Sequence, residues 1–281
     1  MNNRIRRAGF LRYNLTMFFM RGRFAIICFV EAILLLLLVD GIGGNEWLYG
    51  ERVGIFEIFP VLELNVYTLL IITAGWLLMV CDIPFQREGN ALYLVRTTKK
   101  RWCKEQVLSL GICGLCYLFI IYFISVLVSL PHISISNQWS ILCRRSAVQN
   151  GLLGIDGINV PKGILKLSPM AATGYAFGLA FLLLLFLGLF CLVFNCYAKR
   201  FLGLFLAFLL VACDSIVDLM GTKNLPQIAS YTSPLTLARA LANYSPYVTG
   251  YASVGMAFCI LFLGCVVLWI MFQRSSRRME W

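Results

Sequence analysis

A run of 24 residues without a single charge, AATGYAFGLAFLLLLFLGLFCLVF, extends from residue 171 to residue 194. A helix needs roughly 20 mostly apolar residues to cross the hydrocarbon core of a bilayer. Five further stretches have this character, at about residues 24–39, 61–81, 107–130, 201–220 and 251–272. The sequence therefore predicts an all-α polytopic membrane protein with six transmembrane helices.

The composition of the whole chain supports this fold class. Of its 281 residues, 60% are apolar and 13% are charged, with a mean hydropathy of +0.82. Soluble domains have roughly 45–50% apolar and about 25% charged residues, and disordered chains have low hydrophobicity. With so little polar material, much of the surface must face lipid, so the net charge of +11 does not indicate a nucleic-acid-binding protein. Because the longest stretch between spans, 131–170, is itself half apolar, we expect residues 1–281 to form a single transmembrane domain.

The positions of the basic residues predict the orientation. If the N-terminus lies inside, 17 of the 24 Lys and Arg residues fall in inner segments. Cytoplasmic segments carry an excess of Lys and Arg, so we expect both termini in the cytoplasm. The first apolar run lacks a small-residue cleavage site, so we expect it to be a retained helix and not a signal peptide.

Motifs for covalent chemistry are scarce. There is one histidine, no G-x-x-x-x-G-K-[ST] phosphate-binding loop, and one Cys-x-x-Cys spacing, at Cys113 and Cys116 within a span. A structural zinc site needs about four ligands, so no metal site is expected. Asp214 and Asp218 share one helix face and resemble half of the paired aspartate motif of intramembrane prenyltransferases. One hypothesis for the function is therefore an intramembrane enzyme that uses Asp214 and Asp218.

Four acidic residues fall within the predicted spans: Glu31, Glu63, Asp214 and Asp218. A charge at the bilayer centre costs roughly 2.5–3.5 kcal/mol on insertion scales, so such groups usually face a bundle interior or a water cavity. One interpretation places Glu63 and Asp218 at the outer interface, with Glu31 neutral or hydrogen-bonded in the bundle. The other has Glu31 and Asp214 lining a cavity that contacts a polar or cationic cargo.

The segment between the second and third spans, residues 82–106, reads DIPFQREGNALYLVRTTKKRWCKEQ. Its Arg87-Glu88-Gly89 run, the Arg96-Thr97 pair, Trp102 and Lys104 resemble the second cytoplasmic loop of the ABC-2 type permeases. These are the membrane subunits of one class of ATP-binding-cassette exporters. Ser233-Pro234 before the last span is similar to a pattern of the same family. The resemblance implies a type V exporter-like transmembrane domain with six helices.

The resemblance also implies that residues 82–106 are an ATPase-coupling loop. Its apolar side chains would dock in a cleft of the ATPase, and its charged side chains would form the polar rim that interfaces usually have. A helix that simply lies on anionic lipid is the alternative interpretation. The candidate coupling residues are Arg87, Glu88, Gly89, Leu92, Leu94, Val95, Arg96, Lys100 and Arg101.

The N-terminal arm is a second amphipathic element. Its apolar residues recur at three- and four-residue steps among basic ones, which is a helical period. We expect a helix lying in the inner membrane interface, similar to the connecting helix of ABC-2 permeases, which packs near the ATPase. The apolar positions are Ile5, Ala8, Leu11, Leu15, Phe18 and Phe19.

The family resemblance implies a permease subunit that performs no covalent chemistry and holds no cofactor. Two ABC ATP-binding subunits would bind ATP and magnesium, and a second permease copy or a related permease would complete the path. The cargo would be a peptide, a lipid-like molecule or a drug, exported across a bacterial plasma membrane. An ABC-type immunity or sensing subunit against a toxic peptide is the alternative within this class. No nucleic-acid partner is expected.

Overall fold

The computed structural model describes residues 14–16, 18–20, 22–49, 52–84, 98–130, 133–148, 160–197, 202–219, 231–243 and 252–278. The described chain is mostly helical, with two very short strands. Its helices are α2 (Gly22–Tyr49), α3 (Ile58–Leu64), α4 (Val66–Val80), α6 (Lys99–Ser129), α7 (Ile141–Val148), α8 (Pro169–Tyr197), α9 (Leu202–Leu219), α11 (Pro234–Ala238) and α12 (Val254–Arg278). Two 3₁₀ turns, η3 (Ile164–Lys166) and η4 (Ala240–Asn243), and the strands β1 (Val53–Gly54) and β2 (Ile133–Ser134) complete the fold.

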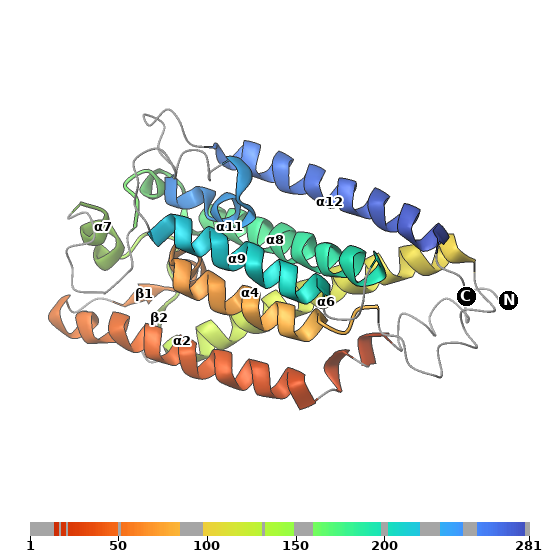
Figure 1. The fold of residues 1–281 in the computed structure, drawn as a ribbon. Helices are drawn as coiled ribbons and strands as arrows, with labels where there is room; N and C mark the ends of the chain where they lie inside the picture. The colour runs from red at the N-terminus through yellow and green to blue at the C-terminus, as the bar shows by residue number, and fades with distance from the viewer. Residues whose placement is uncertain are drawn as a thin grey trace, which may run out of the picture.

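The long helices form a bundle in which successive members run in opposite directions (Figure 1). Helix α8 occupies its middle and packs against α3, α4, α6, α9, α11 and α12. This position agrees with the uncharged run of 24 residues, because a helix that is apolar all round is a buried one. We call the end of the bundle that holds Asp82 and Asn195 the base. We call the opposite end, formed by residues 52–57, 133–148 and 160–168, the top.

Three helices of the described chain are long and apolar enough to cross a membrane: α6, α8 and α12. The pair α3 and α4 meets the same test only when taken together, and it bends by 93° at its break. A shorter apolar segment, Leu202–Cys213, lies in α9. The structure therefore confirms a helical chain with the character of a membrane protein, and the expected number of six spans stays a prediction.

The second predicted span, 61–81, is not one straight helix. Asn65 is extended, with φ −81° and ψ 124°, and its side-chain oxygen accepts a hydrogen bond from the backbone N–H of Tyr67 at 2.9 Å. Asn is among the best N-cap residues, so Asn65 caps the N-terminus of a new helix, α4. The carbonyl of Leu64, at the end of α3, accepts two hydrogen bonds from the Arg239 guanidinium at 3.0 and 2.7 Å.

The third predicted span begins earlier than expected. Helix α6 has 31 residues and starts at Lys99, so residues 99–106 of the predicted coupling loop are the first turns of this helix. Arg101 and Glu105 form an i,i+4 ion pair of 2.9 Å along it. The last part of the loop is thereby continuous with α6, and any movement of that part is also a movement of α6.

The top is organised around a fully buried carboxyl group. Strands β1 and β2 pair in parallel and bring Glu57 beside the start of α7. One carboxyl oxygen of Glu57 accepts the backbone N–H of Ser140 at 2.5 Å, and the other accepts the Ser140 hydroxyl at 2.7 Å. Negative groups are favourable at a helix N-terminus. Glu57 therefore fastens α7 to the start of α3, a contact between residues 83 positions apart.

Two further contacts tie the top to the central helix. The Thr173 hydroxyl, in the first turns of α8, donates to the carbonyl of Phe56 at 2.5 Å. The indole N–H of Trp139 donates to the carbonyl of Leu167 at 2.7 Å, just before α8 begins. The segments before α3, α7 and α8 are thus joined to one another by side-chain hydrogen bonds.

Burial raises the pKa of the Glu57 carboxyl, and the hydrogen bonds from Ser140 oppose this shift only in part. The folded protein then holds the Glu57 proton more tightly than the unfolded chain does. Stability from this group is greatest below its ordinary pKa and falls as the pH rises through the raised value. In thermal unfolding series from acidic to neutral pH, we expect the melting temperature of the wild type to fall relative to that of Glu57→Gln. A difference that is constant over this range would contradict the assignment.

Candidate coupling junction

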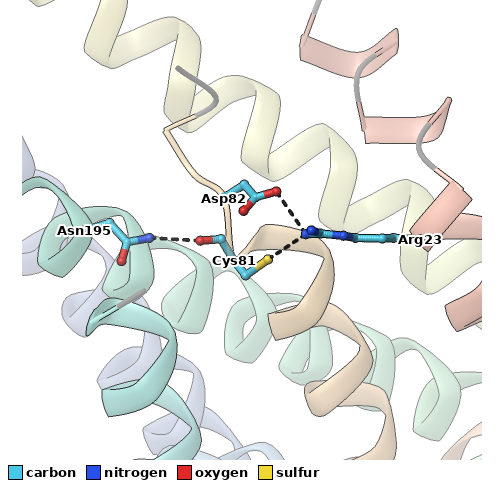
Figure 2. A network of polar contacts seen from close by, with 4 residues as sticks. All are labelled: Arg23, Cys81, Asp82 and Asn195. Atoms are coloured by element: carbon cyan, nitrogen blue, oxygen red, sulfur yellow. Dashed lines mark hydrogen bonds and ion pairs between the residues drawn. The ribbon is translucent and has the colours of Figure 1, made fainter. Parts of the chain in front are cut away.

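A short turn, residues 81–84, leaves the base end of α4 and leads into residues 85–97, which lie outside the described part of the chain. Its first contact is with α2. The Arg23 guanidinium donates to the Cys81 sulfur at 3.3 Å and to an Asp82 carboxyl oxygen at 3.0 Å (Figure 2). Both charged side chains are partly exposed, at 57% and 28%. A surface ion pair of this kind contributes little stability, so its effect is mainly to place α2 beside the turn.

The second contact of the turn is with α8 and is more enclosed. The Asn195 amide nitrogen donates to the carbonyls of Cys81 at 3.3 Å and Ile83 at 2.7 Å. Figure 2 shows Asn195 reaching the turn from the side opposite Arg23. The Asn195 amide oxygen meanwhile accepts the backbone N–H of Gly203 at 2.9 Å, in the first turn of α9. One side chain therefore joins the turn, the end of α8 and the start of α9.

Gly203 allows the close approach of α9 to α8. A Cβ atom at this position would lie 2.4 Å from the Cys191 carbonyl oxygen and 2.7 Å from the Asn195 amide oxygen. Distances under 3.0 Å require something to shift, and the Cys191 carbonyl is part of a helix backbone. The small residue is therefore a steric requirement of this junction.

Aromatic contacts extend the base to the remaining helices. Trp102, near the start of α6, packs against Phe272 of α12 with ring centroids 5.6 Å apart. Phe18, before α2, packs against Trp76 of α4 at 6.0 Å and is 4% exposed. The described end of the N-terminal arm is thus buried against the bundle. The rest of the predicted interfacial helix lies outside the described residues.

Most of the predicted coupling residues also lie outside the described part of the chain. This holds for Arg87, Glu88, Gly89, Leu92, Leu94, Val95 and Arg96. Lys100 is exposed in the first turn of α6, and Arg101 pairs with Glu105. The structure therefore describes where the two ends of the predicted loop are held, and its docking role stays a prediction.

Glu31 of α2 is buried inside the bundle, 2% exposed. It shares a hydrogen bond with the Tyr117 hydroxyl of α6, which also lies 2.9 Å from the carbonyl oxygen of Ile72 in α4. A hydroxyl has only one proton to donate. If Tyr117 donates to the Ile72 carbonyl, which has no proton, Glu31 must donate to Tyr117 as a neutral acid. This arrangement agrees with the interpretation of Glu31 as a hydrogen-bonded group within the bundle.

Glu63 is buried among the helices, and its expected place at the outer interface stays a prediction. It is 3% exposed in α3 and lies within reach of the positive charge of Arg239, the residue that caps the same helix. Of the other two acidic residues, Asp214 and Asp218, only the backbone of α9 is described. Their predicted role in a cavity lies outside what the structure describes.

The residues that organise the base and the breaks were not found from the sequence. Asn195, Arg239 and Glu57 belong to no motif of the sequence. A signal exists for one position, because Asn65 interrupts an apolar run and Asn is a typical N-cap. In the described residues, no group of three His, Cys, Asp or Glu side chains is placed to hold a metal ion.

Comparisons with known proteins give no relative: no family model, no curated protein and no solved structure matches the chain. The geometry of the base is therefore the main guide to function. It contains no nucleophile paired with a base in the described residues, but it does contain a turn fixed to three helices. A displacement of this turn would also act on the side chains that hold it to these helices.

We expect Asn195→Asp to destabilise the protein by about 1–3 kcal/mol, because the new carboxylate faces two carbonyl oxygens that have lost their donor. Asp82→Asn removes the exposed ion pair of the same turn and should cost less than about 1 kcal/mol. Thermal unfolding measures both changes, and hydrogen exchange of the amides in residues 80–83 reports the local loosening. Equal effects of the two substitutions would contradict the dominant role of Asn195.

Gly75 faces the Glu31 carboxyl, and a Cβ there would lie 2.0 Å from its oxygen and 2.7 Å from the Tyr117 hydroxyl. We expect Gly75→Ala to cost about 1–3 kcal/mol through overpacking. Gly111→Ala, where a Cβ meets nothing within 4 Å, is the matched control and should be neutral or stabilising by up to about 1 kcal/mol. Adding Glu31→Ala to Gly75→Ala should give a less than additive loss of melting temperature. Additive losses would show that the two positions are independent.

Proposed function

We propose that this chain is the permease subunit of an ABC-2 type exporter, driven by ATP hydrolysed in a separate subunit. The observation that carries the proposal is the attachment of the turn before residues 85–97. Arg23 holds it to α2, and Asn195 holds it to α8 and α9. The other end of the same loop continues into α6. A partner that pushes this loop would therefore act on five helices at once, counting α4.

In the proposed mechanism, ATP-driven closure of two ATPase subunits moves residues 82–106. The base junction passes this movement to the bundle, which changes between inward and outward access. Such coupling requires a nucleotide state that binds the two conformations with different affinity. The small residues Gly75 and Gly203 give close helix contacts at the places where these helices meet.

A second copy of this chain or a related permease would complete the translocation path. The bundle offers a surface for it, because α12 exposes several large apolar side chains toward its outer face. These include Phe262, Leu263, Val267 and Ile270. In a membrane, such a face packs on lipid or on another helix bundle. The cargo class that we propose is a peptide, a lipid-like molecule or a drug, with export as the direction.

The experiment is purification of the full chain from its native membrane, followed by photolabelling with an azido-ATP analogue. We expect a co-purifying protein that takes up the label and hydrolyses ATP. Reversing two charges of the loop, Arg96→Glu with Lys100→Glu, should reduce its recovery about tenfold or more, which corresponds to about 1.4 kcal/mol. Lys162→Glu, an exposed charge of the top, is the matched control and should leave recovery unchanged.

Two results would overturn the proposal. One is that no nucleotide-labelled protein co-purifies with the chain, and that reversal of the loop charges does not change what co-purifies. The other is turnover of a substrate by the purified chain alone, abolished by Asp214→Asn and Asp218→Asn. The second result would establish the intramembrane enzyme instead.

A further inference from the structure

The top of the bundle contains a cavity of about 440 Å³ whose lining is unusual for this chain. Two arginines line it, and the other polar side chains of the lining include serine hydroxyls and a glutamine amide. Its main lining residues are Arg52, Arg144, Ser134, Ser136, Gln138 and Trp139. No carboxylate belongs to the lining given by the described residues. In a molecule with only 13% charged residues, this is a concentrated basic site.

The charges of the two arginines are available to a ligand. Both side chains are exposed, and no carboxylate in the described part of the chain lies in ion-pair contact with either. They come from segments far apart in the sequence, Arg52 just before β1 and Arg144 in α7, and the β1–β2 pairing helps to bring these segments together. Two like charges that line one cavity repel each other, and an anion bound between them would relieve this repulsion.

The wall of the cavity is held in place by buried contacts. Ser140, which also lines it, is 8% exposed and is fixed by both oxygens of Glu57. Trp139 is 6% exposed and is fixed by its hydrogen bond to the Leu167 carbonyl. The Ser134 hydroxyl lies 3.5 Å from the carbonyl of Arg52 and 3.4 Å from that of Val53. The wall between the two arginines' segments is therefore formed before any ligand arrives, which lowers the entropic cost of binding.

The donor set selects the chemistry of the ligand. Guanidinium groups form paired, charge-assisted hydrogen bonds with phosphate and carboxylate. The hydroxyls of the lining serines already donate to protein acceptors, so the Gln138 amide is the further donor that the lining offers beside the two arginines. The volume lies in the range of small-molecule sites, roughly 300–1,000 Å³, and leaves room for an organic group attached to the phosphate.

We propose that this cavity binds a phosphate-type oxyanion between Arg52 and Arg144. The site lies at the end of a bundle of apolar helices (Figure 1), which is the depth of lipid headgroups in a membrane. The phosphate of an anionic phospholipid and free phosphate offer the same chemistry to the two arginines. This inference concerns the top of the molecule and does not depend on the proposed function of the base.

The test compares the wild type with Arg52→Gln/Arg144→Gln in the full chain. One arm measures retention of phosphatidylglycerol by native mass spectrometry after reconstitution with phosphatidylcholine and phosphatidylglycerol. The other arm titrates the detergent-solubilised protein with inorganic phosphate. Lys162→Gln removes one positive charge from the same end without touching the lining. Arg52→Lys/Arg144→Lys keeps both charges but loses the paired hydrogen bonds.

We expect the glutamine pair to weaken binding roughly tenfold or more for each arginine, the lysine pair to weaken it less, and Lys162→Gln to leave it unchanged. Loss in the lipid arm identifies a phospholipid headgroup as the source. Loss in the phosphate arm alone identifies a soluble phosphate. If the glutamine pair matches Lys162→Gln in both arms while its melting temperature equals that of the wild type, the cavity is no oxyanion site. If the Arg52→Gln/Arg144→Gln variant does not fold, the Arg52→Lys/Arg144→Lys variant is the test. Binding as tight as that of the wild type in the lysine variant would contradict the proposed paired hydrogen bonds.

Discussion

The structure depends on one constraint, which is that backbone carbonyls cannot stay unpaired in apolar surroundings. Two places in this bundle release carbonyls from their helices. At the break between α3 and α4, the carbonyl of Leu64 is taken up by Arg239. At the turn after α4, the carbonyls of Cys81 and Ile83 are taken up by Asn195. In each case a side chain from another part of the chain supplies the missing donors, and its position fixes the path of the backbone.

The same constraint explains why polar side chains occur in the core. Trp76 of α4 donates to the carbonyl of Leu184 in α8 at 2.8 Å, and its ring stacks on that of Tyr117. Tyr117 in turn connects α6 to Glu31 and to the Ile72 carbonyl. Each of these groups reaches from one helix to another. Lipid offers no hydrophobic driving force between helices, so hydrogen bonds and close packing specify which of them meet.

The apolar runs were sufficient to predict the helical class and the approximate position of each long helix in the described part of the chain. They did not predict where the helices begin and end. An apolar run does not show where a backbone carbonyl accepts a hydrogen bond from a side chain of another helix. The break after Leu64 depends on Arg239, which is 175 residues away. The extension of α6 back to Lys99 was missed because charged residues were assigned to a loop, although Lys, Arg, Glu and Gln are good helix formers. Asn195 and Glu57 matter because of hydrogen bonds to residues far away in the sequence, and no local sequence pattern predicts such distant partners.

The bond between Arg239 and Leu64 also bears on how the protein is made. Synthesis proceeds from the N-terminus, so α3 and α4 leave the ribosome long before residue 239 exists. Until then the carbonyl at the break needs a substitute donor, such as water, a lipid headgroup or an insertion factor. The contact at the sharp bend of 93° can therefore form only after α8 and α9 have been synthesised. A junction near the beginning of the chain is thus closed by a residue made near its end.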